Sequence, residues 1–311
     1  MNLAERLRIA TRGSRLALWQ AEHVRDRLRA LRPTLTIELC IIKTAGDRIL
    51  DTPLAKIGGK GLFIKELEQA LLENRADIAV HSMKDVPVEI PAALHIPVVL
   101  EREDPRDCLV SRDGHTLAAL PPAAIVGTSS LRRRSQLIRQ RPDLCLQDLR
   151  GNVTTRLEKL ARGEFDAIVL AAAGLRRLAL AEHVTEYFSS TLVIPAIGQG
   201  IIGIECRRGD CAVEALLAPL ENTLARDALT AERALNETLQ GGCQVPIAGY
   251  ARVVGSEVYL EALVASLDGR EQVRAIRHGP RATAAAIGHA LGHHLIEAGA
   301  ARILRDINVL K

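Results

Sequence analysis

The chain has 311 residues, of which 48% are hydrophobic, so we expect two or three domains with cores of ordinary size. Its net charge is +4 at pH 7 and it has only three Phe, three Tyr and one Trp, a poor composition for nucleic-acid sites, which need stacking platforms or a groove-reading element beside the charge. No apolar stretch is long enough to cross a bilayer and no signal-like segment stands at the N-terminus, so we expect a cytoplasmic protein with no membrane partner.

The first hundred residues alternate strand-like and helical patterns. We expect a strand at 8–11, an amphipathic helix at 14–31 and a strand at 35–42. A glycine-rich, charged stretch at 43–61 follows and is a candidate lid. A helix at 62–74 and a strand at 78–80 complete this series, and the order indicates an α/β domain.

A second α/β series begins after the charged, proline-containing stretch 101–107, which suits a hinge. We expect a strand ending at 125–127, a helix at 130–141, a strand at 145–149, a helix at 153–162 and a strand at 167–170. Residues 195–200 suit a second crossover, after which a strand at 201–205 returns to the first domain. Because the chain is expected to cross twice between the two α/β series, the sequence predicts two lobes with a cleft between them.

The last part has a different pattern. A long helix from residue 222 leads to a Gly-Gly-Cys turn, and three strand-like runs at 245–254, 257–267 and 270–278 precede helices to the end. We therefore assign residues 1–100 plus 201–218 to lobe 1, 106–195 to lobe 2 and 222–311 to a smaller α+β C-terminal domain with a three-stranded sheet.

Six cysteines occupy positions 40, 108, 145, 206, 211 and 243, with no CxxC pair and no histidine at zinc spacing, so we expect reduced thiols and no metal site. Cys243 follows two glycines and precedes Pro246 by three residues, which presents its sulfur on a turn. Such a thiol suits covalent attachment or nucleophilic chemistry, and the alternative is a small buried residue in a turn.

Arginine dominates the basic residues, with 34 Arg against 7 Lys. Its planar fork binds carboxylates and phosphates in pairs, although a high-GC genome would produce the same bias. Two expected strand-to-helix turns, at 11–14 and 127–130, have the form of anion sites, and their Ser and Thr residues also suit ordinary helix caps. Arg132 and Arg133 follow the second turn, and Arg150 and Arg156 surround a third junction.

Polar residues follow the strand at 78–80 directly. His81, Ser82, Lys84 and Asp85 stand at the end of a buried strand, where open α/β sheets bind ligands. A carboxylate among cations stays ionised, so Asp85 is able to hold a ring N–H and stabilise a developing cation. The alternative is a solvated loop.

Six motifs together resemble the porphobilinogen deaminase family, in the right order and over nearly the whole chain. They are Thr11-Arg12-Gly13-Ser14, Gly58-Gly59-Lys60-Gly61-Leu62-Phe63, His81-Ser82-Met83-Lys84-Asp85-Val86-Pro87, Gly127-Thr128-Ser129-Ser130-Leu131-Arg132-Arg133, Leu149-Arg150-Gly151-Asn152 and Gly241-Gly242-Cys243-Gln244-Val245-Pro246.

The resemblance implies two lobes like type II periplasmic binding proteins and a third domain that carries the cofactor. It implies a dipyrromethane cofactor bound covalently through Cys243 by a thioether, onto which four porphobilinogen molecules are added head to tail with release of ammonia. Hydrolysis then frees hydroxymethylbilane. A monomer is implied, with porphobilinogen as the small-molecule partner.

The resemblance also implies roles for individual residues. Asp85 becomes the central catalytic group, which accepts hydrogen bonds from pyrrole N–H groups and stabilises the azafulvene cation formed when ammonia leaves. The residues implied to bind cofactor or substrate, or to close the site, are Arg12, Ser14, Lys60, Phe63, His81, Ser82, Lys84, Thr128, Ser129, Ser130, Arg132, Arg133, Arg150, Gly151, Asn152, Arg156, Arg177 and Gln199.

Two residues depart from the common family pattern, and two other protein classes remain as alternatives. Arg15 stands where the family often has Pro, and Arg134 extends the arginine pair, with helix geometry favouring an outward direction for Arg134. A non-catalytic clamshell that binds a polyanionic small molecule is the main alternative, and Cys243 argues against it. A transcription-factor effector domain is the other, but no helix-turn-helix pattern precedes the first strand.

Overall fold

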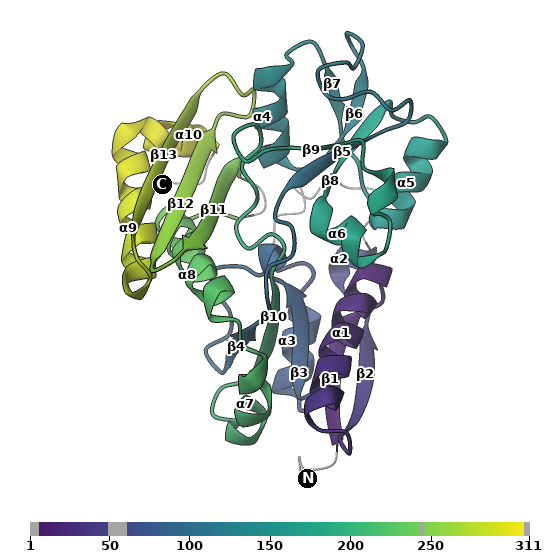
Figure 1. The fold of residues 1–311 in the computed structure, drawn as a ribbon, viewed down its shortest axis with the longest axis vertical. Coiled ribbons are helices and arrows are strands. Elements are labelled where there is room, and N and C mark those ends of the chain that lie inside the picture. Colours follow the sequence, from purple (N-terminus) through teal and green to yellow (C-terminus); the bar gives the residue numbers. More distant parts are fainter. Residues whose placement is uncertain (1–5, 49–60, 243–244, 308–311) are drawn as a thin grey trace. The chain divides into compact units, whose positions relative to one another are not determined.

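The computed structural model describes residues 6–48, 61–242 and 245–307. These residues form two compact units (Figure 1). Among the described residues, unit 1 draws on 6–48, 61–103 and 201–226, and unit 2 draws on 104–200, 227–242 and 245–307. The three-domain boundaries expected from the sequence stay a prediction, since the second lobe and the C-terminal part share one compact unit.

Unit 1 is built on a five-stranded sheet in the order β2-β1-β3-β10-β4. The strands are β1 (Arg6–Arg12), β2 (Thr36–Ile42), β3 (Ile78–Ser82), β4 (Leu94–Val99) and β10 (Ile202–Arg207). β1 is parallel to β2 and β3, whereas β10 is antiparallel to β3 and β4. The strand that returns from far along the chain therefore lies inside the sheet and not at its edge.

Helices cover both faces of this sheet. α1 (Arg15–Leu31) and α7 (Cys211–Leu217) pack on the face that carries Leu7 and Ile9. α3 (Lys65–Leu72) packs on the other face, against Ala10 and Ala79. Because alternate residues of a strand point to opposite faces, the apolar runs of β1 and β3 are buried on both sides. The short elements of the unit are α2 (Ala45–Arg48), η2 (Met83–Asp85) and η4 (Ala218–Leu220).

Unit 2 contains a second five-stranded sheet, in the order β7-β6-β8-β5-β9. The strands are β5 (Asp107–Ser111), β6 (Ile125–Gly127), β7 (Cys145–Gln147), β8 (Ala167–Ala171) and β9 (Glu186–Tyr187). β6 is parallel to β7 and β8, and β5 is antiparallel to β8 and β9. This arrangement repeats that of unit 1, with three parallel strands followed by one antiparallel strand. Helices α4 (Leu131–Gln140), α5 (Val153–Ala161) and α6 (Ala172–Arg177) pack on it, and η3 (Ala181–His183) follows.

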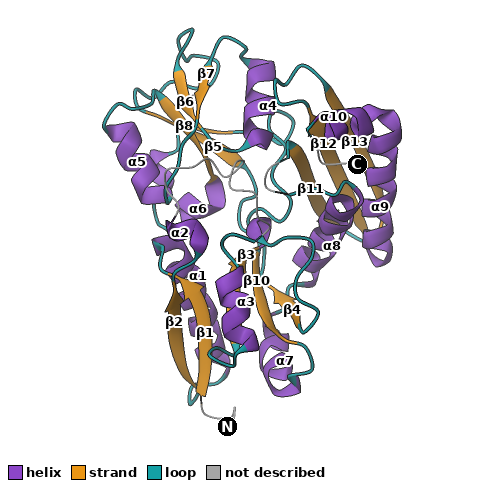
Figure 2. Cartoon of the chain, turned by 180° about the vertical axis from the view of Figure 1, so that it is seen from behind, coloured by secondary structure: helices purple, strands orange, loops and turns teal. Residues whose placement is uncertain are grey.

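The C-terminal part of unit 2 has an antiparallel sheet in the order β11-β12-β13. Its strands are β11 (Ile247–Val254), β12 (Glu257–Ala265) and β13 (Gln272–Pro280). Helices α8 (Thr223–Thr238), α9 (Ala284–Leu295) and α10 (Ala301–Asp306) share one core with the sheet. Figure 2 shows these helices and the sheet from behind. η5 (Arg281–Thr283) precedes α9, and the π-helical turn η6 (Ile296–Ala300) joins α9 to α10 around Gly299, whose φ is 113°.

The predicted fold class is confirmed, as α/β with two sheets of one topology and a separate three-stranded sheet. Some expected bounds were wrong. The expected helix at 62–74 begins only at Lys65, and the expected strand at 145–149 ends at Gln147. β4, β5 and β9 were not expected, because β4 contains His95 and Pro97 and β5 begins inside the charged stretch assigned to a hinge. None of the helices in the described ranges has the length and apolar character that crossing a bilayer requires.

Candidate active site

The polar segment after β3 lies where expected, at the carboxyl end of a central strand of unit 1. Ser82 ends β3, and Lys84 and Asp85 lie in the short helix η2, both partly exposed. His81 points the other way, into the protein: it is 4% exposed and its Nε2 lies 2.9 Å from Oε2 of the buried Glu205 on β10. His81 thus fixes β3 to β10 beneath the turn that presents Asp85.

Arg12 lies at the end of β1, beside the end of β3. Its guanidinium pairs with Asp47 and stacks over the ring of Phe63, 4.1 Å from the ring centre. Burial opposes the charge of Asp47, but hydrogen bonds from Arg12 and Thr44 outweigh it and lower the pKa of this carboxyl. Arg12 and Phe63 are therefore in contact, and Arg12 has an acidic partner that the sequence interpretation did not include.

Ser14 is the N-cap of α1, and its Oγ accepts a hydrogen bond from the backbone N–H of Ala17, at 3.3 Å. Its hydroxyl therefore has a structural use in the helix. The role in ligand binding implied by the resemblance stays a prediction.

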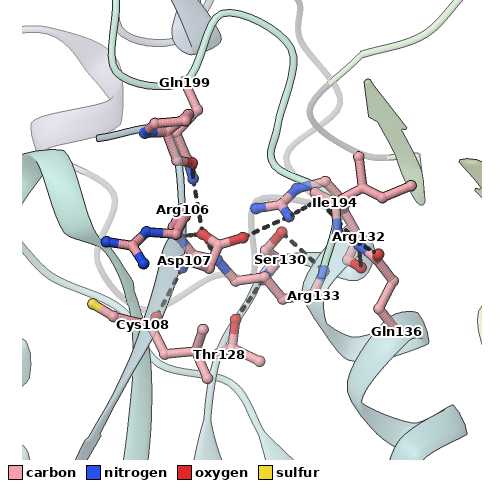
Figure 3. A network of polar contacts seen from close by, with 12 residues as sticks. Arg106, Asp107, Cys108, Thr128, Ser130, Arg132, Arg133, Gln136, Ile194 and Gln199 are labelled. Atoms are coloured by element: carbon pink, nitrogen blue, oxygen red, sulfur yellow. Dashed lines mark hydrogen bonds and ion pairs between the residues drawn. The ribbon is translucent and has the colours of Figure 1, made fainter. Parts of the chain in front are cut away.

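A network of polar contacts in unit 2 surrounds Asp107, the first residue of β5 (Figure 3). Arg132 donates from Nη1 to Asp107 Oδ2 at 2.7 Å and to the carbonyl of Ile194 at 2.7 Å. Arg133 donates to Asp107 Oδ1 from Nε at 3.0 Å and from Nη2 at 2.7 Å, and its Nη1 donates to the carbonyl of Val169. Both arginines extend from the first turn of α4 into the lobe, and they are only 5% and 6% exposed.

Burial and the attraction between opposite charges shift the pKa values of Asp107 and Arg132 in this network. Complete burial opposes ionisation of Asp107, but attraction to Arg132 and Arg133 outweighs it and holds the pKa of the carboxyl below its ordinary range. The same burial lowers the pKa of Arg132. One carboxylate thus compensates two guanidiniums, which leaves these three side chains with a net positive charge.

Gln199 joins this network from the crossover that follows lobe 2. Its Nε2 donates to the carbonyl of Pro105 at 2.6 Å and to Asp107 Oδ1 at 3.0 Å. Its Oε1 is buried and has no hydrogen-bond partner among the residues that the structure describes. A buried acceptor without a donor is costly, so this atom is suited to receive a donor from a bound molecule.

Three hydroxyl residues precede α4 at the end of β6. Ser130 is the N-cap, and its Oγ accepts from the N–H of Arg133. Thr128 is 2% exposed and its Oγ1 accepts from the N–H of Ser130 at 3.3 Å. Ser129 donates to the carbonyl of Leu149 at 2.9 Å, which ties this turn to the end of the neighbouring strand.

The third expected junction, between β7 and α5, is also present. Gly151 has φ of 114°, and a Cβ placed on it would lie 2.9 Å from Cγ2 of Thr155. Both the backbone conformation and the close contact therefore favour glycine at this position. Asn152 caps α5 by accepting from the N–H of Thr155, and Arg156 donates to the carbonyl of Gly151 at 2.8 Å. Burial lowers the pKa of Arg150, against the attraction of Asp148.

Of the remaining expected site residues, the structure describes Arg177 but not Lys60 or Cys243. Arg177, at the end of α6, is 8% exposed and donates to the carbonyl of Gly200 at 2.6 Å. Lys60 and Cys243 lie outside the described residues, as does most of the candidate lid. Arg134 points outward, as helix geometry predicts, and pairs with Asp148 at 3.2 Å.

Sequence reasoning missed two carboxylates, Asp47 and Asp107. The signal for Asp107 was present, because an acidic residue directly precedes the apolar run 108–110, which reads as a buried strand. The charged stretch before it obscured this strand. Asp47 had no such signal.

Taken together, the ends of parallel strands in each unit carry guanidiniums, capped helix N-termini and hydroxyl groups. These are donors for carboxylate or phosphate oxygens. Within the described residues, Asp85 is the partly exposed carboxylate among the expected site residues, so it is the candidate for chemistry that needs a negative charge.

Solved structures similar to this chain include a periplasmic binding protein and a regulatory domain. The periplasmic aliphatic sulphonate binding protein SsuA from Escherichia coli is 16% identical, over 75% of this chain and 70% of its own, with a TM-score of 0.41. The regulatory domain of OxyR2 from Vibrio vulnificus is 14% identical, over 71% and 98%, with a TM-score of 0.43. Likenesses this distant say nothing about what this chain binds.

Comparison of the sequence with protein-family models gives a far more specific result than these structural likenesses. Residues 7–215 match the family model described as porphobilinogen deaminase, dipyromethane cofactor binding domain. Residues 227–297 match the model for the porphobilinogen deaminase C-terminal domain. The two matches follow one another in order and together span all three sheets, so the chain belongs to the porphobilinogen deaminase family.

Proposed function

We propose that this chain is a deaminating transferase that condenses four porphobilinogen molecules head to tail on a dipyrromethane cofactor and then releases hydroxymethylbilane by hydrolysis. In each addition the bond from the aminomethyl carbon to nitrogen breaks and ammonia leaves. A carbon–carbon bond to the chain forms, and the attacked pyrrole carbon loses a proton. The observation that carries the proposal is the match of both family domains, in order, to this chain.

The described residues fit a group of this kind. Each pyrrole of substrate and cofactor brings an acetate and a propionate, and the carboxyl ends of β1, β6 and β7 are followed by arginines and capped helix N-termini. When bound, the cofactor supplies the pyrrole carbon to which the first substrate is joined. The buried Oε1 of Gln199 accepts hydrogen bonds, which pyrrole N–H groups are able to donate.

The two buried arginines of α4 take different roles in this proposal. All three side-chain nitrogens of Arg133 donate to Asp107 or to the Val169 carbonyl, so Arg133 holds Asp107 in place. Within the described residues, Arg132 uses Nη1 for its hydrogen bonds to Asp107 and to the Ile194 carbonyl, and in this proposal its Nε and Nη2 bind a ligand carboxylate. Arg12, Arg150, Arg156 and Arg177 bind further carboxylates, with Ser14, Thr128, Ser129, Ser130, Gly151 and Asn152 supplying hydrogen bonds.

Asp85 is the catalytic residue of the proposal. Its carboxylate accepts hydrogen bonds from pyrrole N–H groups and stabilises the positive charge that develops on the substrate as ammonia leaves. The His81–Glu205 pair beneath it keeps the end of β3 in place. Lys84 and Ser82 stand beside it to bind substrate carboxylates, and Lys60 and Phe63 help to close the site.

Cys243 is proposed as the attachment point of the cofactor, through a thioether. The test is the intact mass of the purified protein beside the variants Cys243→Ser and Cys211→Ser. We expect a mass excess equal to two linked pyrrole units in the parent and in the Cys211→Ser control, whose thiol is exposed on α7. The excess is expected to be absent from Cys243→Ser, which is also expected to be inactive.

Two outcomes would overturn parts of the proposal. A parent that stays unmodified and inactive after incubation with porphobilinogen or with preformed hydroxymethylbilane would favour a binding protein of the same fold. A Cys243→Ser variant that keeps the mass excess would place the attachment on another residue.

A further inference from the structure

A histidine and a cysteine face each other on two neighbouring strands of the unit 1 sheet, one of which is its edge strand. Cys206 of β10 and His95 of β4 are direct partners in the antiparallel ladder. A register shift between Ile204 and Cys206 creates this pairing. Sγ of Cys206 lies 3.5 Å from Nε2 of His95. Bulges of this kind re-aim side chains and are frequent at functional positions.

A carboxylate from a third element meets the same pair. Glu214 lies on α7, and its Oε1 is 2.9 Å from Nε2 of His95. The same oxygen accepts a hydrogen bond from the N–H of Gly209 at 3.1 Å. Asp210 caps α7 by accepting from the N–H of Val213, which fixes the turn that carries Glu214. The thiol, imidazole and carboxylate atoms all lie within 4.8 Å of one another.

Access and electrostatics suit a cation. The side chains of His95 and Glu214 are 22% and 32% exposed, whereas Cys206 is fully buried behind them. The carboxylates of Glu214 and Asp210 act on Cys206, and Arg207 opposes them. Burial raises the pKa of the Cys206 thiol to about 12, so this residue is unsuited to act as a free nucleophile.

We propose that His95, Cys206 and Glu214 form a binding site for a zinc-class divalent transition metal. One nitrogen, one sulfur and one oxygen ligand are a set that zinc accepts, whereas calcium and magnesium prefer oxygen alone. Binding releases the thiol proton of Cys206 to solvent. Because two ligands are partly exposed, the fourth position is open to water.

The present distances are close to those that zinc needs. With bonds of about 2.1 Å to nitrogen and 2.3 Å to sulfur, tetrahedral ligands lie about 3.6 Å apart. The sulfur–nitrogen separation of 3.5 Å already has this value. The oxygen–nitrogen separation of 2.9 Å must widen by a small movement, which the partly exposed Glu214 is free to make.

The metal would join β4, β10 and α7, three elements of unit 1 that converge from distant parts of the chain. Its expected effect is stabilisation of this unit, because an ion that binds only the folded state shifts the unfolding equilibrium. The site shares no residue with the proposed active site, so its test is independent of the proposed function.

The test uses the full-length protein after treatment with a chelator. Zinc is titrated against a chromophoric competitor, and cobalt is added separately to detect the near-ultraviolet absorption of a cobalt–thiolate bond. We expect about one zinc per chain and a higher thermal midpoint with zinc. Cys206→Ser is expected to abolish the cobalt–thiolate absorption, and Glu214→Gln to weaken zinc binding by at least about 10-fold, a loss that is typical even of residues that only orient a ligand.

Cys211→Ser is the matched control, since Cys211 is an exposed thiol on the same helix. It should bind zinc as the parent does. Glu214→Gln also guards against misfolding as the explanation, because it alters a partly exposed side chain and leaves the buried Cys206 intact. Equal zinc affinity in the parent, Cys206→Ser and Glu214→Gln would overturn the proposal, as would a parent that binds no zinc.

Discussion

At the scale of single residues, the abundance of arginine has a use that the sequence did not reveal. Arg8 is paired with Asp77, Arg12 with Asp47, and the two arginines of α4 with Asp107. Three of the arginines that were expected to bind a ligand, Arg12, Arg132 and Arg133, are therefore already bound to acidic side chains of the protein. A ligand carboxylate at these places has to share the guanidinium with its protein partner or displace that partner.

Asp85→Asn tests the catalytic role directly, because the substitution keeps the shape of the side chain and removes its charge. We expect turnover to fall by about 10²–10³-fold, in the range found when one electrostatic contact to a transition state is removed. The cofactor should remain attached, as measured by intact mass, since attachment is assigned to another residue.

Asp26→Asn is the matched control for that experiment. Asp26 also lies in unit 1, and its side chain is 63% exposed beside Arg25. This variant should keep the turnover of the parent. Undiminished turnover in Asp85→Asn would rule out the catalytic assignment.

At the scale of elements, the turns that follow β1, β6 and β7 share one design. Each ends a parallel strand and begins a helix whose first N–H groups are capped by Ser14, Ser130 or Asn152. The capping alternative raised from the sequence is thus correct for Ser14 and Ser130, and Asn152 is a third cap that the sequence interpretation did not include. A cap and an anion site are compatible, because a helix N-terminus has several N–H groups and a side-chain cap satisfies only some of them.

Gly151→Ala tests the turn between β7 and α5. The new Cβ would lie 2.9 Å from Cγ2 of Thr155 at a backbone φ of 114°, so we expect a local cost of about 1–3 kcal/mol and a raised KM for porphobilinogen. Gly114→Ala is the control, since Gly114 also has positive φ but no atom within 4 Å of its added Cβ. Equal behaviour of the two variants in hydrogen exchange and kinetics would refute the steric explanation.

At the scale of the whole molecule, the Asp107 network links segments that are distant in the sequence. It joins β5, β8 and α4 to residues 194–199, all within unit 2 (Figure 3). Its pH dependence follows from the direction of the Asp107 pKa shift. A carboxyl whose folded pKa lies below its unfolded value of about 4 stabilises the fold above that pH, and this stabilisation is lost as the pH falls through the lowered pKa.

Asp107→Asn is therefore expected to cost about 3–5 kcal/mol at pH 7, because two buried guanidiniums lose their compensating charge. The loss of stability is measured by hydrogen exchange of peptides from β5 and α4. This method is preferable to fluorescence, because the single tryptophan, Trp19, lies in unit 1. The variant should also lose less stability than the parent on acidification from pH 5 to pH 3.

Asp148→Asn is the comparison, since the Asp148–Arg134 pair is exposed and such pairs contribute about 0–1 kcal/mol. If hydrogen exchange of β5 and α4 increases equally in Asp107→Asn and Asp148→Asn, the buried network does not stabilise unit 2.

The sequence by itself determined the α/β class, the strand-to-helix turns and the family, because these depend on local periodicity and on short motifs that are read along the chain. It did not reveal β5, nor the pairing of Asp107 with Arg132 and Arg133, because charge next to an apolar run looks the same whether it is solvated or buried. Only the tertiary structure brought His95, Cys206 and Glu214 together. Their meeting depends on strand pairing between positions more than a hundred residues apart, which no local spacing encodes.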